Sequence, residues 1–171
     1  MASTITWIDA AYPPKLYPEG AQGLAFYIGG DTPHVWTPAE IQACHYVYRL
    51  PIFVRSNPVY SEAGEDVNLA ITRLNVIGAP KGIIVAWDSE TSVDPRYIGD
   101  VYKLLSQGGY KMMDYGSNST VFGNDIPDGY YWGADWTNRP HIDLKTQMTQ
   151  WESAEDYDTD LSTKALPWWK V

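Results

Sequence analysis

Residues 82–90 read Gly82-Ile83-Ile84-Val85-Ala86-Trp87-Asp88-Ser89-Glu90, an apolar, β-branched run that ends in two carboxylates. So uniform a run predicts a strand that is buried on both faces, which is the usual condition in a parallel sheet. Residues i and i+2 of a strand project from one face, so we expect Asp88 and Glu90 to point the same way. Acids at the carboxyl end of such a strand lie where α/β barrels and open α/β sheets carry their chemistry.

Strand-like runs alternate with helical or loop segments along the rest of the chain, a pattern typical of parallel β/α units. Alternation, β-branched runs and turn signals predict strands at residues 4–8, 24–28, 51–54, 82–88, 110–115, 130–135, 146–151 and 157–161. Eight strands in this arrangement favour a closed barrel with a parallel strand core.

Three helices are predicted between the early strands. The first begins at Thr37, whose capping box with Pro38 and Glu40 starts a helix that we expect to reach Tyr48. The others cover residues 64–77 and 95–106. We therefore expect one domain over residues 1–171 with an α/β fold, a compact, partly degenerate (β/α)8 TIM-type barrel whose later helices are short or absent.

Composition narrows the function classes. The net charge is −9 and no cluster of Lys or Arg is present, so nucleic-acid binding is not expected. Cys44 falls within the first predicted helix, where a buried structural thiol is expected, and His34, His45 and His141 lack metal-ligand spacing. We therefore predict no metal or cofactor. No signal pattern or 18-residue apolar stretch occurs, so neither a secretion signal nor a membrane span is expected, and the compartment stays open.

Aromatic residues are unusually distributed, with 8 Trp and 13 Tyr against 3 Phe. Trp and Tyr join a flat apolar face to a polar group, which suits both core packing and stacking on sugar rings. Near the predicted strand ends, Tyr115, Trp136 and Trp151 are candidate sugar platforms, and ordinary barrel packing is the alternative for each.

Further acids follow other predicted strands. Asp9 ends the first, Asp114 and Asp135 end the fifth and sixth, and either Asp158 or Asp160 belongs to the last, where the inward-facing parity is open. In a barrel, strand ends meet at one face, so these acids are expected to join Asp88 and Glu90, with Asp135 contacting substrate. Such crowding could equally bind a divalent cation, although no calcium-loop motif occurs.

The order of these acids resembles glycoside hydrolase family 25, the lysozymes (muramidases) of bacteria and phages, whose barrel is shortened and incomplete. The residues that match are Asp9, Asp88, Glu90 and Asp160, and Gln150-Trp151 resembles the family's Gln-Tyr pair. The segment Tyr27–Gly30 and the Pro-capped helix are more similar to related glycoside-hydrolase-like barrel domains of phage and actinobacterial proteins. The third strand ends at Arg55 and lacks the family's usual histidine motif.

The resemblance implies a hydrolase of bacterial cell-wall glycan, with these four acids in its site. Glycosidic cleavage needs a protonated carboxyl beside the leaving oxygen and a second group that stabilises an oxocarbenium-like transition state. Glu90 is the expected general acid because the charge of Asp88 raises the pKa of a neighbouring acid, whereas Arg55 would lower it. Asp88 could instead orient a 2-acetamido group of the substrate.

A second hypothesis remains open. The barrel could be catalytically weak or inactive and serve as a structural or glycan-binding module of a virion or cell-surface assembly. An enzyme should bring its acids together in an open cleft. A structural module should instead have that cleft filled, its acids paired with Arg or Lys, or an extensive protein interface.

Overall fold

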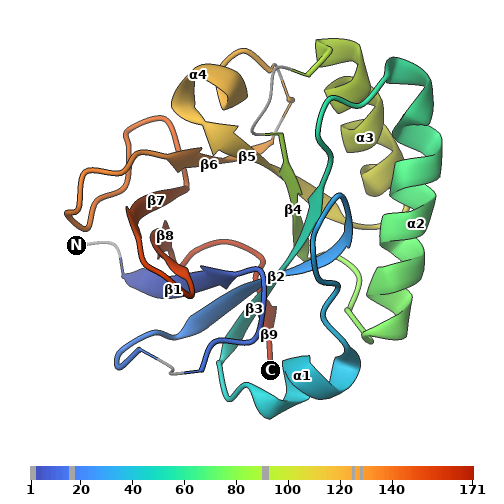
Figure 1. The fold of residues 1–171 in the computed structure, drawn as a ribbon. Helices are drawn as coiled ribbons and strands as arrows, with labels where there is room; N and C mark the ends of the chain where they lie inside the picture. The colour runs from blue at the N-terminus through green and yellow to red at the C-terminus, as the bar shows by residue number, and fades with distance from the viewer. Residues whose placement is uncertain (1–2, 16–17, 90–92, 125, 128) are drawn as a thin grey trace.

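The computed structural model describes residues 3–15, 18–89, 93–124, 126–127 and 129–171 (Figure 1). The strands are β1 (Thr4–Ala10), β2 (Gly23–Gly30), β3 (Tyr48–Val54), β4 (Ile84–Asp88), β5 (Lys111–Ser117), β6 (Tyr130–Ala134), β7 (Met148–Ser153), β8 (Asp158–Thr163) and β9 (Trp169–Lys170). The helices are α1 (Pro38–Ala43), the 3-10 turn η1 (Tyr60–Glu62), α2 (Ala63–Val76), α3 (Pro95–Gln107) and α4 (Asn118–Val121).

The strands close into a barrel. Their order is β2-β1-β8-β7-β6-β5-β4-β3, and the pairing of β3 with β2 completes the ring seen in Figure 1. Strands β1 to β7 are parallel where they pair, as predicted for an α/β barrel. Strand β8 runs antiparallel to both β1 and β7, so the expectation of a fully parallel core is wrong there. Only residues 154–157 separate β7 from β8, too few for the crossover that a parallel pair requires.

Helices cover only part of this barrel. Figure 1 shows α2 and α3 side by side along β2 to β5, and no helix of the described residues follows β1, β6 or β7. Helix α1 has the expected capping box at Thr37 and Glu40, but it ends at Ala43 instead of reaching Tyr48. Tyr48 begins β3, where its amide donates to the Gln22 carbonyl and its ring packs in the barrel. Cys44 is therefore buried at the end of α1 and not within it.

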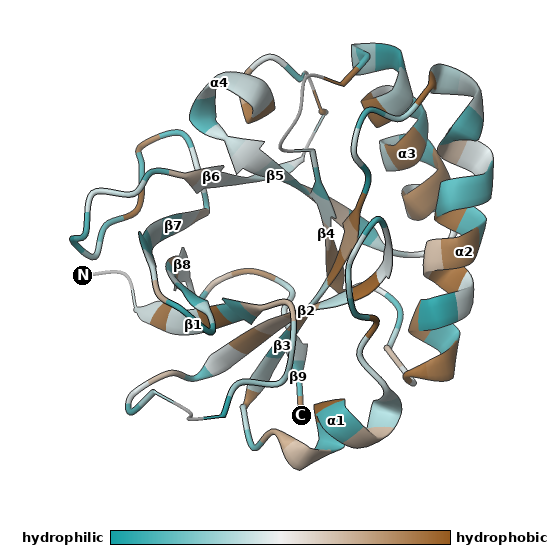
Figure 2. Ribbon diagram, in the orientation of Figure 1, coloured by the Kyte–Doolittle hydropathy of each residue, from teal (hydrophilic) through white to brown (hydrophobic). Residues whose placement is uncertain are grey.

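Side chains pack in two layers because strand residues alternate between the barrel interior and the helix-covered surface. Strand β4 shows the alternation most clearly, with Ile84 and Ala86 inside and Val85 and Trp87 outside, all buried. It lies between β3 and β5, which confirms that the apolar run is a central strand. Helices α2 and α3 carry both hydrophobic and hydrophilic residues, as Figure 2 shows, because one face of each packs on the outer layer.

The last residues of the chain close the amino-terminal end of the barrel. Strand β9 was not predicted; it pairs with the first residues of β3. The Trp168 ring packs on Trp7 with centroids 4.7 Å apart, and its indole nitrogen donates to the Thr163 carbonyl over 3.0 Å. This end of the barrel is therefore filled with aromatic rings, and the carboxyl ends of the parallel strands form the other end.

Substitution of Gly23 tests this packing. A Cβ atom at Gly23 would overlap the indole of Trp7, whereas one at Gly64 in α2 meets no atom within 4 Å. We expect Gly23→Ala to lower the free energy of unfolding by about 1–3 kcal/mol because it overpacks the interior. Gly64→Ala is the control and should leave it unchanged or raise it by up to about 1 kcal/mol. Urea denaturation measures both, and equal stability of the two variants would contradict the prediction.

Candidate active site

Strand alternation directs several acids into the open end of the barrel. In β1, Ile5 and Trp7 face the interior, so Asp9 faces it too; in β4, Asp88 follows Ile84 and Ala86 in the same way. Both carboxylates lie at the carboxyl ends of their strands and are buried.

The reversed strand β8 contributes two more acids. Its register places Asp158 opposite Asp9, and Asp160 opposite Trp7 one layer deeper. Asp158 and Asp160 are two residues apart and share one face of the strand. Both side chains therefore face the interior of the barrel, Asp158 near the rim and Asp160 one layer deeper.

Asp160 is fully buried on the interior face. Its Oδ1 accepts a hydrogen bond from Trp132 Nε1 at 2.9 Å, and its Oδ2 has no hydrogen-bond partner among the described residues. Burial raises the pKa of Asp160 well above its ordinary value, and the negative charges of Asp9 and Asp158 raise it further. Asp160 thus retains a proton at pH values where an exposed aspartate is ionised.

Tyr115 marks the point where the acids meet. Its ring stacks on Trp132 with centroids 3.9 Å apart, and its hydroxyl donates to Asp9 Oδ2 over 3.4 Å. Burial and then the negative charge of Asp9 raise the pKa of this phenol, with smaller contributions from Tyr27, Asp88 and Asp160. Acids from three strands therefore act on one hydroxyl. The Tyr115 ring is buried in the interior of the barrel.

Glu90 lies outside the described residues, so its role stays a prediction. The residue before it, Ser89, is buried, and its amide donates to the Tyr115 carbonyl over 2.8 Å. The Asp88 carbonyl accepts from the Arg55 amide over 3.4 Å.

A chain of hydrogen bonds connects an exposed tryptophan to the acids. The Trp136 side chain follows β6, is 64% exposed and donates through Nε1 to Gln150 Oε1 over 2.9 Å. The Gln150 amide in turn donates to Asp158 Oδ2 over 2.8 Å. Burial raises the pKa of Asp158. In the sequence, Gln150 was noted only through the family resemblance. It lies two residues after Met148 on β7, so its side chain shares the interior face, and this spacing could have indicated that it contacts the acids.

The side chains of Asp135 and Trp151 are not part of the hydrogen-bonded series Trp136–Gln150–Asp158. The Asp135 carboxylate is 3.1 Å from His141 Nε2, and the Arg139 carbonyl is 2.9 Å from the other ring nitrogen. These two contacts raise the pKa of His141, the carbonyl contact more than the carboxylate. Trp151 is half-buried at a bulge in β7 between two paired residues.

Two further charged groups face away from the interior. Asp114 lies on the outer face of β5, where Ser89 and Asn124 donate to its carboxylate. Arg55 contacts three carboxylates of its own cluster, namely Asp31, Glu62 and Asp66, at 2.8–3.2 Å. Within the described ranges, no group of three or more His, Cys, Asp or Glu side chains could hold a metal ion.

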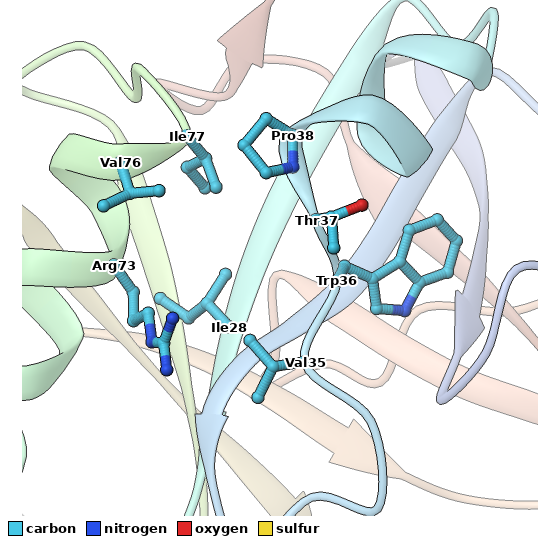
Figure 3. Close-up of a pocket in the computed structure, with 8 residues that line it drawn as sticks. All are labelled: Ile28, Val35, Trp36, Thr37, Pro38, Arg73, Val76 and Ile77. Carbon is cyan, nitrogen blue, oxygen red and sulfur yellow. The ribbon is translucent and has the colours of Figure 1, made fainter.

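A groove leads outward from the acids. A cavity of about 240 Å³ is lined by Asp9, Tyr27, Asp158 and the β7–β8 turn. A neighbouring cavity of about 330 Å³ shares Ala11, Glu155 and Asp156 with it and continues along residues 12–15. The cavity in Figure 3 is separate: it measures about 160 Å³, lies between β2, α1 and α2, and is lined largely by apolar side chains.

No protein-family model matches the chain, and no curated protein matches its sequence. Solved structures share its fold. An uncharacterized protein of B. stearothermophilus matches with a TM-score of 0.75 at 18% identity over 95% of this chain and 97% of that one. A glycosyl hydrolase 25 of Streptococcus pneumoniae matches with 0.69 at 11% identity, over 94% and 87%. The modular autolysin LytC of the same organism, solved with a synthetic peptidoglycan ligand, matches with 0.67 at 12% identity, over 92% and 46%.

These identities establish a likeness of fold. The chain shares its α/β barrel fold with these solved structures, a glycosyl hydrolase 25 among them. In the described part of the chain, no helix is long and apolar enough to cross a membrane.

The buried carboxyl of Asp160 should weaken the fold as the pH rises. Its folded-state pKa lies above that of the unfolded chain, so stability is greatest below the unfolded value and is lost as the pH rises through the folded value. Asp160→Asn keeps an acceptor for Trp132 and removes the charge. We expect the free energy of unfolding of Asp160→Asn, relative to that of the wild type, to increase as the pH rises from the unfolded-state to the folded-state pKa of Asp160. The increase should be about 1.4 kcal/mol for each unit by which folding raises that pKa.

Denaturation of both proteins between about pH 4 and pH 8 measures this gain, because the unfolded-state pKa of Asp is near 4. Asp156→Asn removes an exposed acid of the nearby turn and is the control. If the difference in free energy of unfolding between Asp160→Asn and the wild type is the same at every pH, the prediction is wrong.

Proposed function

We propose that this chain is a glycoside hydrolase that cleaves bacterial cell-wall glycan by carboxylate acid–base catalysis. The observation that carries the proposal is the burial of three acids, Asp9, Asp88 and Asp160, in the barrel, where Asp9 accepts a hydrogen bond from the Tyr115 hydroxyl. Acids gathered there are costly to the fold, which is expected of a site kept for chemistry.

In the proposed reaction, Glu90 donates its proton to the leaving glycosidic oxygen. Asp88, two residues earlier in the sequence and at the end of β4, stabilises the oxocarbenium-like transition state or orients a 2-acetamido group. Asp9 accepts a hydrogen bond from the Tyr115 hydroxyl and lines the groove, so it is the second carboxylate within reach of substrate. Asp160, buried one layer deeper, holds a proton and limits the negative charge beside Asp9.

Arg55 does not oppose this assignment. Its guanidinium is engaged by Asp31, Glu62 and Asp66, so its charge is compensated within that cluster. The expectation for a purely structural module, acids paired with Arg or Lys, is not met by Asp158 or Asp160, whose side-chain partners are Gln150 and Trp132.

The groove and Trp136 suit a sugar chain. The groove begins at Asp9 and Asp158, and the exposed Trp136 ring is tied to Asp158 through Gln150. Sugar rings stack on such indoles. Peptidoglycan is the proposed substrate because the autolysin of the same fold binds a synthetic peptidoglycan ligand, and the bacterial cell wall is the proposed place of action.

Replacement of the general acid tests the reaction. We expect Glu90→Gln to lower the rate of peptidoglycan cleavage by at least about 10²–10⁴-fold, because the amide cannot donate the proton, while the fold is unchanged. Glu65→Gln removes one exposed charge from α2 and should cleave at the wild-type rate.

Turbidity loss and released muropeptides measure the cleavage, and circular dichroism checks the fold. A wild type that cleaves no peptidoglycan, or a Gln variant that cleaves as fast, overturns the enzyme proposal in favour of the glycan-binding or structural module.

The aromatic platform has its own test. We expect Trp136→Ala to raise KM for soluble glycan fragments about tenfold with little change in kcat, since stacking acts on ground and transition states alike. Leu144→Ala in the same β6–β7 connection removes a fully exposed apolar side chain and should leave both constants unchanged. A fall in kcat alone would assign Trp136 to the chemistry instead of to binding.

A further inference from the structure

Asp114 is a buried acid that the proposed reaction does not use. It lies on the outer face of β5, level with Trp87 of β4, the residue before Asp88. Its Oδ1 accepts from the Ser89 hydroxyl over 2.7 Å, and its Oδ2 accepts from Asn124 Nδ2 over 2.8 Å. Both donors are buried as well, so the contact is shielded from water.

Ser89 is the residue between the two proposed acids. Its amide donates to the Tyr115 carbonyl, and its hydroxyl donates to Asp114, so backbone and side chain are both held against β5. Because Ser89 follows β4 directly, fixing it on the outer side limits the directions open to the inward-facing side chain of Asp88 before it. Asp114 therefore acts on the site through Ser89 without touching the substrate.

The contact can change with protonation. Ser89 Oγ also lies 3.3 Å from the Tyr115 carbonyl, a second acceptor. When Asp114 is ionised, the hydroxyl donates to it; when Asp114 is protonated, its own O–H donates to Ser89, whose hydroxyl turns to the Tyr115 carbonyl. The described side chains that bond Asp114, from the end of β4 and from the turn after α4, are neutral, so no cation there holds it ionised.

We propose that Asp114 is a positioning residue that, through Ser89, holds the end of β4 in the arrangement that the acids Asp88 and Glu90 need for cleavage. The inference rests on the function proposed above. Burial raises the pKa of Asp114 to about 6, so the contact changes form within the range in which cell-wall hydrolysis would be measured. The ionised form accepts from both donors and is the productive one.

The pH profile of catalysis tests the proposal. We expect the wild-type kcat to fall below about pH 6 with a titration that belongs to Asp114. In Asp114→Asn, which resembles the protonated acid, kcat near neutral pH should be about tenfold lower and that titration should disappear, while KM is unchanged. Glu65→Gln, an equal loss of charge on α2, should keep the wild-type profile. An unchanged profile in Asp114→Asn overturns the proposal.

Carboxyl and amide NMR titrations test the same contact without activity. The Asp114 carboxyl of the wild type and the amides of residues 89 and 90 should titrate together, and the amide titration should vanish in Asp114→Asn. Ser89→Ala, a smaller change, should raise the pKa of Asp114 because a donor to the ionised form is lost. If the amide of residue 90 does not follow Asp114, the proposal fails; if the titrations agree but the wild type cleaves no glycan, only the proposed reaction fails.

Discussion

The antiparallel insertion of β8 between β1 and β7 is the constraint on which the rest of the structure depends. Its two ladders close the ring of strands without a further crossover helix. The same register brings Asp158 level with Asp9 at the rim and Asp160 level with Trp7 below it. The same strand pairing therefore closes the sheet and positions the acids. A one-residue shift in the register of β8 would turn both of its acids out of the barrel.

The interior balances two opposed demands. Large aromatic rings fill it, with Trp7 and Trp168 at one end and Tyr115 on Trp132 nearer the other. Their apolar contacts stabilise the barrel, yet the same low polarity makes each nearby carboxylate costly to ionise. Two of these rings offset part of that cost with hydrogen bonds: the Trp132 indole donates to Asp160, and the Tyr115 hydroxyl donates to Asp9.

Elements with strong local signals were predictable from the sequence. The capping box at Thr37, the two long helices and β4 follow from neighbours along the chain, and so does the position of Asp9 and Asp88 at strand ends. The alternation of Asp158, Asp160 and Ser162 is the same in either direction and carries no signal for the direction of β8. The signal was the short connection after the seventh predicted strand, which is too short for a parallel crossover. Helix α1 stops early for a tertiary reason, the burial of Tyr48 in the barrel. The bond between Ser89 and Asp114 joins residues that no local pattern relates.

The aromatic closure by β9 has a consequence for how the protein can be handled. Strand β1 begins, and β9 ends, at the end of the barrel opposite the acids, and Val171 is exposed there. A tag, a fused domain or a surface linkage attached after Val171 therefore leaves the groove unobstructed. A linker of only a few residues suffices, since the attachment and the entrance for substrate lie on opposite faces of the molecule.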